Sequence, residues 1–169
     1  MAEGATGTTR GTTSASSFKE KTNLWFIAIL RIFVGYFFLM SGINKIRDGA
    51  LADPEKLMGL LEEWSASAPS WYADFLKQAV IPNGQIFNYL VVSGEVLVGA
   101  CLILGLFSRF AGFFGMVMTF NFFFATYHMG PASQGINSAF FLICLVILLS
   151  GAGRSIGIDR KLRKKIPWV

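Results

Sequence analysis

The chain is poor in the residues that build metal, thiol and phosphate sites. It contains one histidine and two cysteines among its 169 residues. Cys101 and Cys144 lie in apolar runs and form no C-x-x-C pair, which argues against a thiol relay and favours small core residues. His128 has no second histidine or cysteine close to it in sequence, so no metal site is expected. No haem motif, phosphate-binding loop or nucleophilic triad is recognisable.

Charged residues are also scarce. Lys, Arg, Asp and Glu make up 15% of the chain, whereas hydrophobic residues make up 53%, with 17 Phe and a mean hydropathy of +0.53. A soluble domain of this size rarely carries so much apolar surface, and here the apolar residues are gathered in blocks. We therefore expect one membrane domain and no second globular domain.

Four apolar runs are candidates for membrane-crossing helices. The fourth is short and needs flanking residues to its N-terminal side to span a bilayer. The runs cover about residues 24–46, 86–107, 110–127 and 136–151.

Short turns between the later runs predict antiparallel hairpins. Only Ser108 and Arg109 separate the second run from the third, and Gly130-Pro131 marks the turn between the third and the fourth. The predicted fold class is therefore all-α, an integral membrane four-helix bundle over residues 23–159.

The distribution of Lys and Arg predicts the orientation. The N-terminal tail, the turn at Arg109 and the C-terminal tail carry basic residues, whereas the loop between the third and fourth runs carries none. Basic segments favour the cytoplasmic side, which places both termini inside (N-in/C-in). An odd number of spans would put the two basic tails on opposite faces, so the charge pattern supports four.

Two tails flank the bundle. Residues 1–22 are rich in Gly, Ala, Ser and Thr and predict a disordered cytoplasmic tail. Residues 160–169 form a basic cytoplasmic tail, in which Arg160-Lys-Leu-Arg-Lys-Lys165 would meet anionic lipid headgroups. Nucleic acid is not an expected partner, because no soluble domain presents this basic patch.

The outer loop, residues 47–85, contains two amphipathic helical patterns. The first begins at Pro54 and the second at Pro69, and both carry Trp or Tyr among their apolar residues. Such helices either lie on the outer membrane surface or cap the bundle, and the sequence leaves both arrangements open.

Glu95 is the most informative residue, because a carboxylate inside a membrane helix is costly unless it is protonated, paired or hydrated. A rise of 1.5 Å per residue places Glu95, Asn121 and Asn137 roughly 20 Å from the cytoplasmic ends of their helices. The long side chain of Arg31 can reach towards the same level. Lipid cannot satisfy these groups, so all four should face the bundle interior.

Two interpretations of this polar level remain open. In the structural one, Arg31 and Glu95 form an interhelical ion pair and the two amides fix the packing. In the functional one, the same groups surround a ligand or a proton. Lys45 and His128, at the outer ends of the first and third runs, would then line the mouth of the cavity, although a lysine at a helix end also extends to the interface by default.

The order of several short segments resembles the DoxX family of small four-helix membrane proteins, which includes the DoxD-like subunit of thiosulfate:quinone oxidoreductase. The segments are Arg31-Ile-Phe-Val-Gly35, Ser41-Gly-Ile-Asn-Lys45, Gly94-Glu95 with Gly99, Gly105-Leu-Phe-Ser-Arg109, Asn121-Phe-Phe-Phe and Gly151-Ala-Gly-Arg-Ser-Ile-Gly-Ile-Asp159. The resemblance implies a four-helix bundle in the cytoplasmic (inner) membrane of a prokaryote. For some members it implies quinone-linked oxidation of sulfur compounds, with a second membrane or extracytoplasmic subunit as partner.

Residue roles follow from that hypothesis, with quinone as the expected cofactor. Glu95 and Arg31 are the catalytic candidates: Glu95 would accept or relay a proton, and Arg31 would hold it ionised or bind an anionic group. The candidates for binding quinone or an anionic substrate are Asn121, Asn137, Lys45 and His128.

The alternative hypothesis is a non-enzymatic membrane assembly or partner protein. In it the Arg31–Glu95 pair is structural, and the outer loop docks a partner. A small-solute transporter would need an inverted repeat or broken helices, and no convincing internal repeat is present.

Overall fold

The structure, a computed structural model, describes residues 25–51, 53–150 and 157–159. Helices and turns account for these residues, and no strand occurs among them, which confirms the all-α class. The predicted tails at residues 1–22 and 160–169 lie outside the described residues.

Four long helices correspond to the four predicted runs. They are α1 (Trp25–Arg47), α4 (Gly84–Leu104), α5 (Ser108–Ala125) and α6 (Pro131–Ser150). Among the described helices, α1, α6 and the continuous segment that contains α4 are long and apolar enough to cross a membrane. The 18-residue α5 is not one of these three, because it includes the polar side chains of Ser108, Arg109 and Asn121.

The turn between α4 and α5 differs from the prediction. Ser108 and Arg109 already belong to α5, and the chain reverses at Gly105 and Phe107, whose φ angles are 66° and 48°. Glycine adopts this left-handed conformation without a Cβ penalty and commonly ends helices in this way, whereas Phe107 is strained by roughly 1 kcal/mol or more. The signal that ends α4 is therefore the glycine and not the polar pair.

The turn between α5 and α6 was predicted correctly, although α6 is longer than its apolar run. α6 begins at Pro131, directly after Gly130 with φ 82°. Proline suits the first helical position, because its N–H would have no partner there. The polar residues that follow Pro131 therefore form the first turns of α6.

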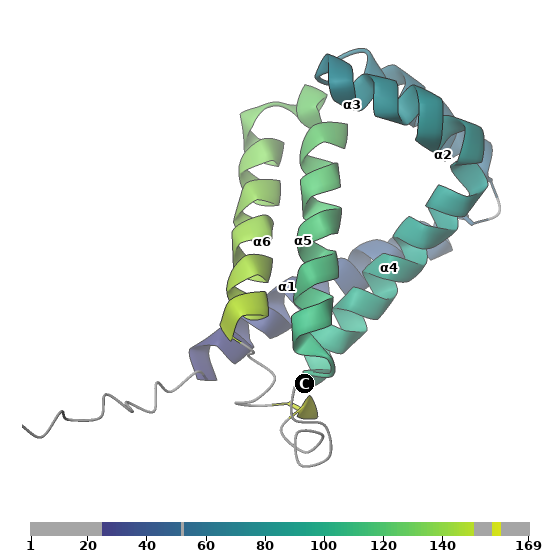
Figure 1. The fold of residues 1–169 in the computed structure, drawn as a ribbon. Coiled ribbons are helices and arrows are strands. Elements are labelled where there is room, and N and C mark those ends of the chain that lie inside the picture. Colours follow the sequence, from purple (N-terminus) through teal and green to yellow (C-terminus); the bar gives the residue numbers. More distant parts are fainter. Residues whose placement is uncertain (1–24, 52, 151–156, 160–169) are drawn as a thin grey trace, which may run out of the picture.

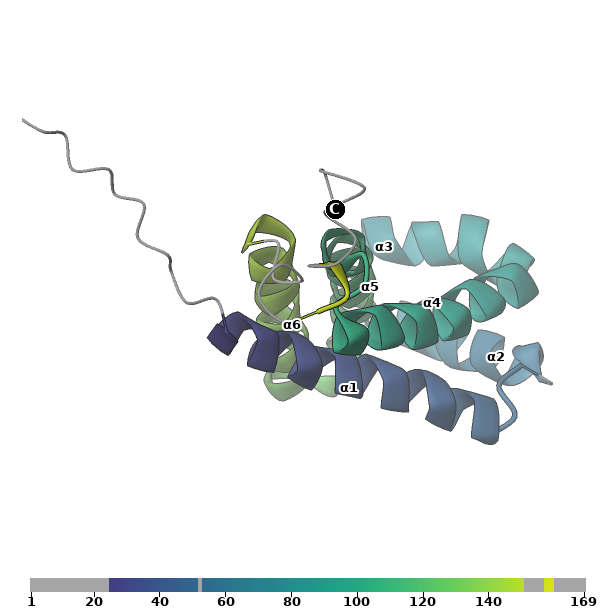
Figure 2. The ribbon, with the colours of Figure 1, turned by 90° about the horizontal axis from the view of Figure 1, so that it is seen from below.

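The long helices form two antiparallel pairs that cross at an angle (Figure 1). α1 packs along α4 and α5 packs along α6, and Figure 2 shows the first pair side by side with the second pair nearly end-on. Glycines allow the close approach of α1 and α4. A Cβ on Gly99 would collide with the backbone nitrogen of Leu39, and a Cβ on Gly35 would lie 2.9 Å from Cβ of Leu102. Polar side chains of the two helices can therefore meet directly.

The core between the pairs is apolar and tightly filled. Val34 of α1, Leu102 of α4, and Cys144 and Ile147 of α6 are completely buried in it. Cys144 thus packs as a small core residue, as predicted from its apolar surroundings, while Cys101 is half-buried against the same core.

The outer loop forms a helical arch, called the cap here, over one end of the molecule (Figure 1). Its elements are α2 (Pro54–Ser65), α3 (Ser70–Phe75), η1 (Leu76–Val80) and η2 (Ile81–Asn83). Leu61, Tyr72, Leu76 and Val80 bury their side chains together with Ala125 at the end of α5. The amphipathic helices therefore cap α4 and α5. We call this end of the molecule the cap end, and the opposite end, at Gly105–Phe107, the turn end.

Candidate functional site

Glu95 is the centre of a polar cluster between α1 and α4. Its side chain is 1% exposed. Lys45 Nζ donates to Glu95 Oε1 at 2.6 Å, and the Ser41 hydroxyl donates to the same oxygen at 3.0 Å. Ser41 and Lys45 are four residues apart on α1 and therefore share one helix face. One turn of α1 thus supplies both donors to the buried carboxylate.

Gly42 brings α1 close enough for these bonds. A Cβ on Gly42 would lie 3.2 Å from Cβ of Glu95 and 3.1 Å from the backbone nitrogen of Val96. A larger residue would push α4 away and lengthen the Lys45–Glu95 contact. The segment Ser41–Lys45 therefore combines a hydroxyl donor, a gap and an ammonium group.

The second carboxylate oxygen of Glu95, Oε2, is buried and has no hydrogen-bond partner among the described residues. Buried polar atoms are nearly always bonded, so each exception calls for an explanation. A carboxylate oxygen can accept a bond from a ligand or hold a proton. Oε2 is therefore the position in this cluster that is open to a further hydrogen bond.

Lys45 links the buried carboxylate to the surroundings. Its side chain is 36% exposed, against 1% for Glu95, and its Nζ also lies 5.1 Å from the ring centre of Phe122 on α5. A cation over an aromatic face is attracted by the ring quadrupole. Lys45 thus connects all three helices α1, α4 and α5 near the cap end.

Arg31 lies at the turn end, so the predicted Arg31–Glu95 ion pair is not formed. A Cβ on Gly105 would be 2.6 Å from Arg31 Nη1, and Gly105 is ten residues, or roughly 15 Å, beyond Glu95 along α4. Helical side chains point back towards the N-terminus of their helix, which for α1 is the turn end. The Arg31 side chain therefore extends towards the turn end, and not towards Glu95 as its depth in the helix had suggested.

Asp159 is the acid that accompanies Arg31. It is 3% exposed, and its negative charge acts on the Arg31 guanidinium. Asp159 Oδ1 accepts the backbone N–H of Phe107 at 2.7 Å, and Oδ2 accepts that of Ser108 at 2.9 Å. The backbone N–H of Asp159 donates to Gly105 O at 3.0 Å. Asp159 therefore satisfies the amides at the start of α5 and closes the turn end.

The two predicted amides make local bonds. Asn121 Nδ2 donates to Val117 O of its own helix at 2.8 Å. Asn137 Nδ2 donates to Thr126 Oγ1 at 3.2 Å and to Ser133 O at 3.1 Å, which ties α6 to the end of α5. Neither amide is hydrogen-bonded to Glu95 within the part of the chain that the structure describes.

His128 stacks on Trp64 of α2, with ring centres 5.1 Å apart and an interplanar angle of 27°. His128 belongs to η3 (Tyr127–Met129), directly after α5. The stack fastens the cap to the α5–α6 hairpin. His128 and Lys45, which were predicted to line the mouth of a cavity, thus contact different rings, those of Trp64 and Phe122.

Sequence reasoning identified Glu95 and Lys45 but missed Ser41, Gly42 and Asp159. A usable signal existed for the first two, because Ser41 and Lys45 are spaced four apart around a glycine in an apolar run. No such signal marked Asp159, since its partners are backbone amides 51 and 52 residues earlier in the chain.

Comparison with known proteins supports the resemblance that the sequence suggested. The DoxX family model matches residues 26–128, which include Arg31, Lys45 and Glu95 but not Asp159. No curated protein and no solved structure matches the chain.

Proposed function

Since the chain belongs to the DoxX family and is a multi-pass membrane protein by its apolar helices, we propose that it handles protons in quinone-linked redox chemistry, as a subunit or small enzyme. Under this proposal α5 also crosses the membrane, which gives four spans in an N-in/C-in bundle in the cytoplasmic membrane of a prokaryote. A sulfur compound is the electron donor, and a second membrane or extracytoplasmic subunit is the partner that delivers the electrons.

The observation that carries the proposal is the unequal satisfaction of the two Glu95 oxygens. Oε1 accepts from both Lys45 and Ser41, whereas Oε2 is buried without a partner among the described residues. A buried ion pair is favourable only when further hydrogen bonds satisfy its remaining lone pairs. A pair that served packing alone would have little reason to leave Oε2 unsatisfied.

Each residue of the cluster has a role in this chemistry. A quinone bound beside Glu95 would supply the electron-accepting ring, and the free Oε2 fits it as an acceptor for a ligand hydroxyl. Glu95 holds a proton at Oε2 and exchanges it with a ligand oxygen. Lys45 pairs with Glu95 at Oε1 and, with a side chain that is 36% exposed, provides a route for the proton. Ser41 fixes the orientation of the carboxylate.

The test uses the full-length protein purified in detergent. Bound quinone is extracted and quantified, and thiosulfate- or sulfite-dependent quinone reduction is measured for the wild type and for Glu95→Gln. We expect Glu95→Gln to retain quinone but to lose turnover by roughly 10²- to 10⁴-fold, the usual contribution of general acid–base catalysis. Glu63→Gln, the same change at an exposed site of α2, is the matched control and should keep full turnover.

Two results would contradict the proposal. A wild-type protein with neither bound quinone nor turnover, alone or with its co-purified partner, would remove the redox function. Equal turnover of Glu95→Gln and Glu63→Gln would remove Glu95 from the mechanism even if quinone reduction were real.

The alternative function, a non-enzymatic assembly protein, is favoured by the exposed aromatic surface of the cap. Trp71 is 54% exposed and Phe75 is 40% exposed, and large apolar side chains grouped on a surface mark binding sites. This alternative requires Trp71→Ser to abolish co-purification of a partner while Glu95→Gln affects only folded yield. Intact co-purification of Trp71→Ser would count against it.

A further inference from the structure

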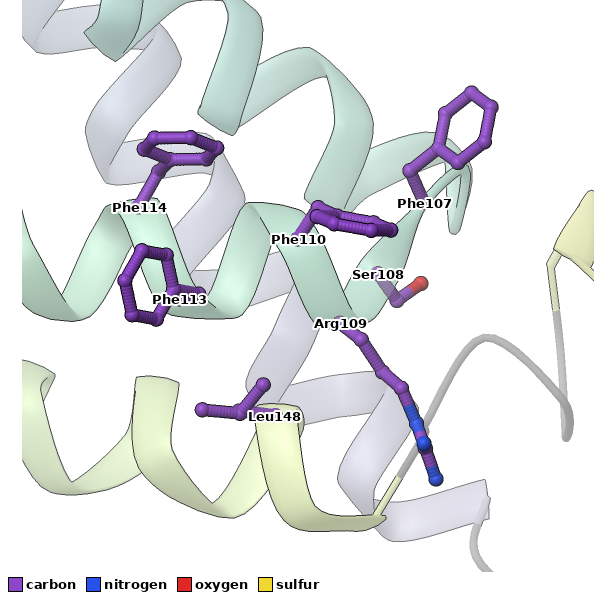
Figure 3. A pocket seen from close by; sticks show the side chains of 7 residues that line it. All are labelled: Phe107, Ser108, Arg109, Phe110, Phe113, Phe114 and Leu148. Carbon is purple, nitrogen blue, oxygen red and sulfur yellow. The ribbon is translucent and has the colours of Figure 1, made fainter. Parts of the chain in front are cut away.

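A cavity of about 430 Å³ lies at the turn end, beside the beginning of α5. Figure 3 shows phenylalanine rings between residues 107 and 114, together with Leu148 of α6, forming its apolar wall. Ser108 and Arg109 form its polar part. The cavity is therefore amphipathic, with an apolar wall and a cationic, hydroxyl-bearing end.

The polar part of this cavity lacks partners among the described residues. Ser108 is 1% exposed, and its hydroxyl has no hydrogen-bond partner among the described residues. Arg109 Nε is also buried without a partner, and the structure gives Arg109 no ion pair within the described ranges. Buried donors left in this way indicate a missing acceptor.

Asp159 does not supply that acceptor. Both of its carboxylate oxygens accept backbone N–H groups, from Phe107 and Ser108, and its charge acts on Arg31. The positive charge of Arg109 is thus available to an anion from outside the protein.

We propose that the cavity binds an anionic phospholipid. Its phosphate oxygens would accept from Arg109 and from the Ser108 hydroxyl, and one acyl chain would lie over the phenylalanine rings and Leu148. Arg109 is the second residue of α5, just after the turn that follows the apolar α4, so it lies where a spanning helix ends and headgroups begin. Arginine suits this role, because its planar guanidinium matches phosphate geometry. The site does not rest on the redox function, since Glu95 lies near the middle of α4, roughly 15 Å from the turn end.

The experiment measures lipid retention by native mass spectrometry of the full-length protein in detergent. Phosphatidylglycerol and phosphatidylcholine with the same acyl chains are added separately, and inorganic phosphate is added as a third arm. We expect phosphatidylglycerol to be retained preferentially, and Arg109→Gln to weaken its binding roughly tenfold, the value of one lost charged hydrogen bond. Ser108→Ala should weaken it about threefold, because a neutral donor contributes less.

Arg47→Gln is the matched control, because it removes one positive charge from the exposed cap end of α1 and should leave retention unchanged. If Arg109→Gln fails to fold, Arg109→Lys keeps the charge without the planar donor pair and should show a partial loss. Equal losses in Arg109→Gln and Arg47→Gln would overturn the site. So would equal retention of the two lipids, or displacement of the lipid by millimolar phosphate, which would show a site for free anions.

Discussion

The two ends of the α1–α4 pair each bury a charge, but they satisfy it differently. At the turn end, Asp159 uses both carboxylate oxygens on backbone amides, and its charge faces the buried Arg31. At the cap end, Glu95 uses one oxygen on two donors and leaves the other without a partner among the described residues. A carboxylate with both oxygens hydrogen-bonded, such as Asp159, is suited to holding the fold. A carboxylate with one oxygen left over, such as Glu95, is suited under the proposed function to exchanging a proton.

The basic partner is buried at the turn end and partly exposed at the cap end. Arg31 is 1% exposed, so its guanidinium cannot turn to solvent when Asp159 is removed. Lys45 is 36% exposed, so its ammonium group can turn to solvent when Glu95 is removed. An acid at the turn end is therefore more important for stability than the acid at the cap end.

The largest expected effect comes from isosteric neutralisation of the two acids. Asp159→Asn leaves a buried guanidinium without its acid and should lower the free energy of unfolding by about 3–5 kcal/mol. Glu95→Gln should cost only about 1–2 kcal/mol, because Lys45 can be hydrated. Thermal melting of both variants in the same detergent measures the difference. Equal melting temperatures would mean that the two ends are not functionally distinct.

An effect of intermediate size should come from Gly99, which lies on α4 between the two ends. Gly99→Ala places a Cβ against the backbone of Leu39, which cannot move aside, and should cost about 3 kcal/mol. Gly94→Ala is the control on the same helix, since its Cβ would be 3.4 Å from Sδ of Met118, an ordinary contact. A Gly99→Ala protein as stable as Gly94→Ala would show that the helices are not as close as described.

The smallest expected effect tests the cap. His128→Ala removes the stack on Trp64 and should cost about 0.5 kcal/mol, while increasing hydrogen exchange in α2. His128→Phe keeps a flat ring at the same place and should restore protection. If exchange in α2 is the same in wild type and His128→Ala, then the stack does not hold the cap.

The helices could be predicted from the sequence because each has a local cause. Four apolar runs gave α1, α4, α5 and α6, and Pro54 and Pro69 predicted the beginnings of α2 and α3. The boundary at Gly105 was missed, because a polar pair three residues further on looked more like a turn. The sequence pattern treats the third run as a span, whereas α5 is not among the described helices that are long and apolar enough to cross a membrane.

The candidate site could be predicted only in part. Glu95 and Lys45 stood out because charged residues are rare in apolar runs. The pairing of Glu95 with Lys45 could not be predicted, because counting residues gives the depth of a side chain but not the direction in which it points. Asn137 illustrates the same limit. It lies at the depth of Glu95 by residue count, but its side-chain amide donates hydrogen bonds to Thr126 and to the backbone of its own helix.

The contact of Asp159 with the α4–α5 turn also restricts how far the following residues can reach. Arg160-Lys-Leu-Arg-Lys-Lys165 begins one peptide bond after a buried residue. Because both of its carboxylate oxygens accept backbone N–H groups at the start of α5, Asp159 fixes the point from which the chain continues beside the turn end.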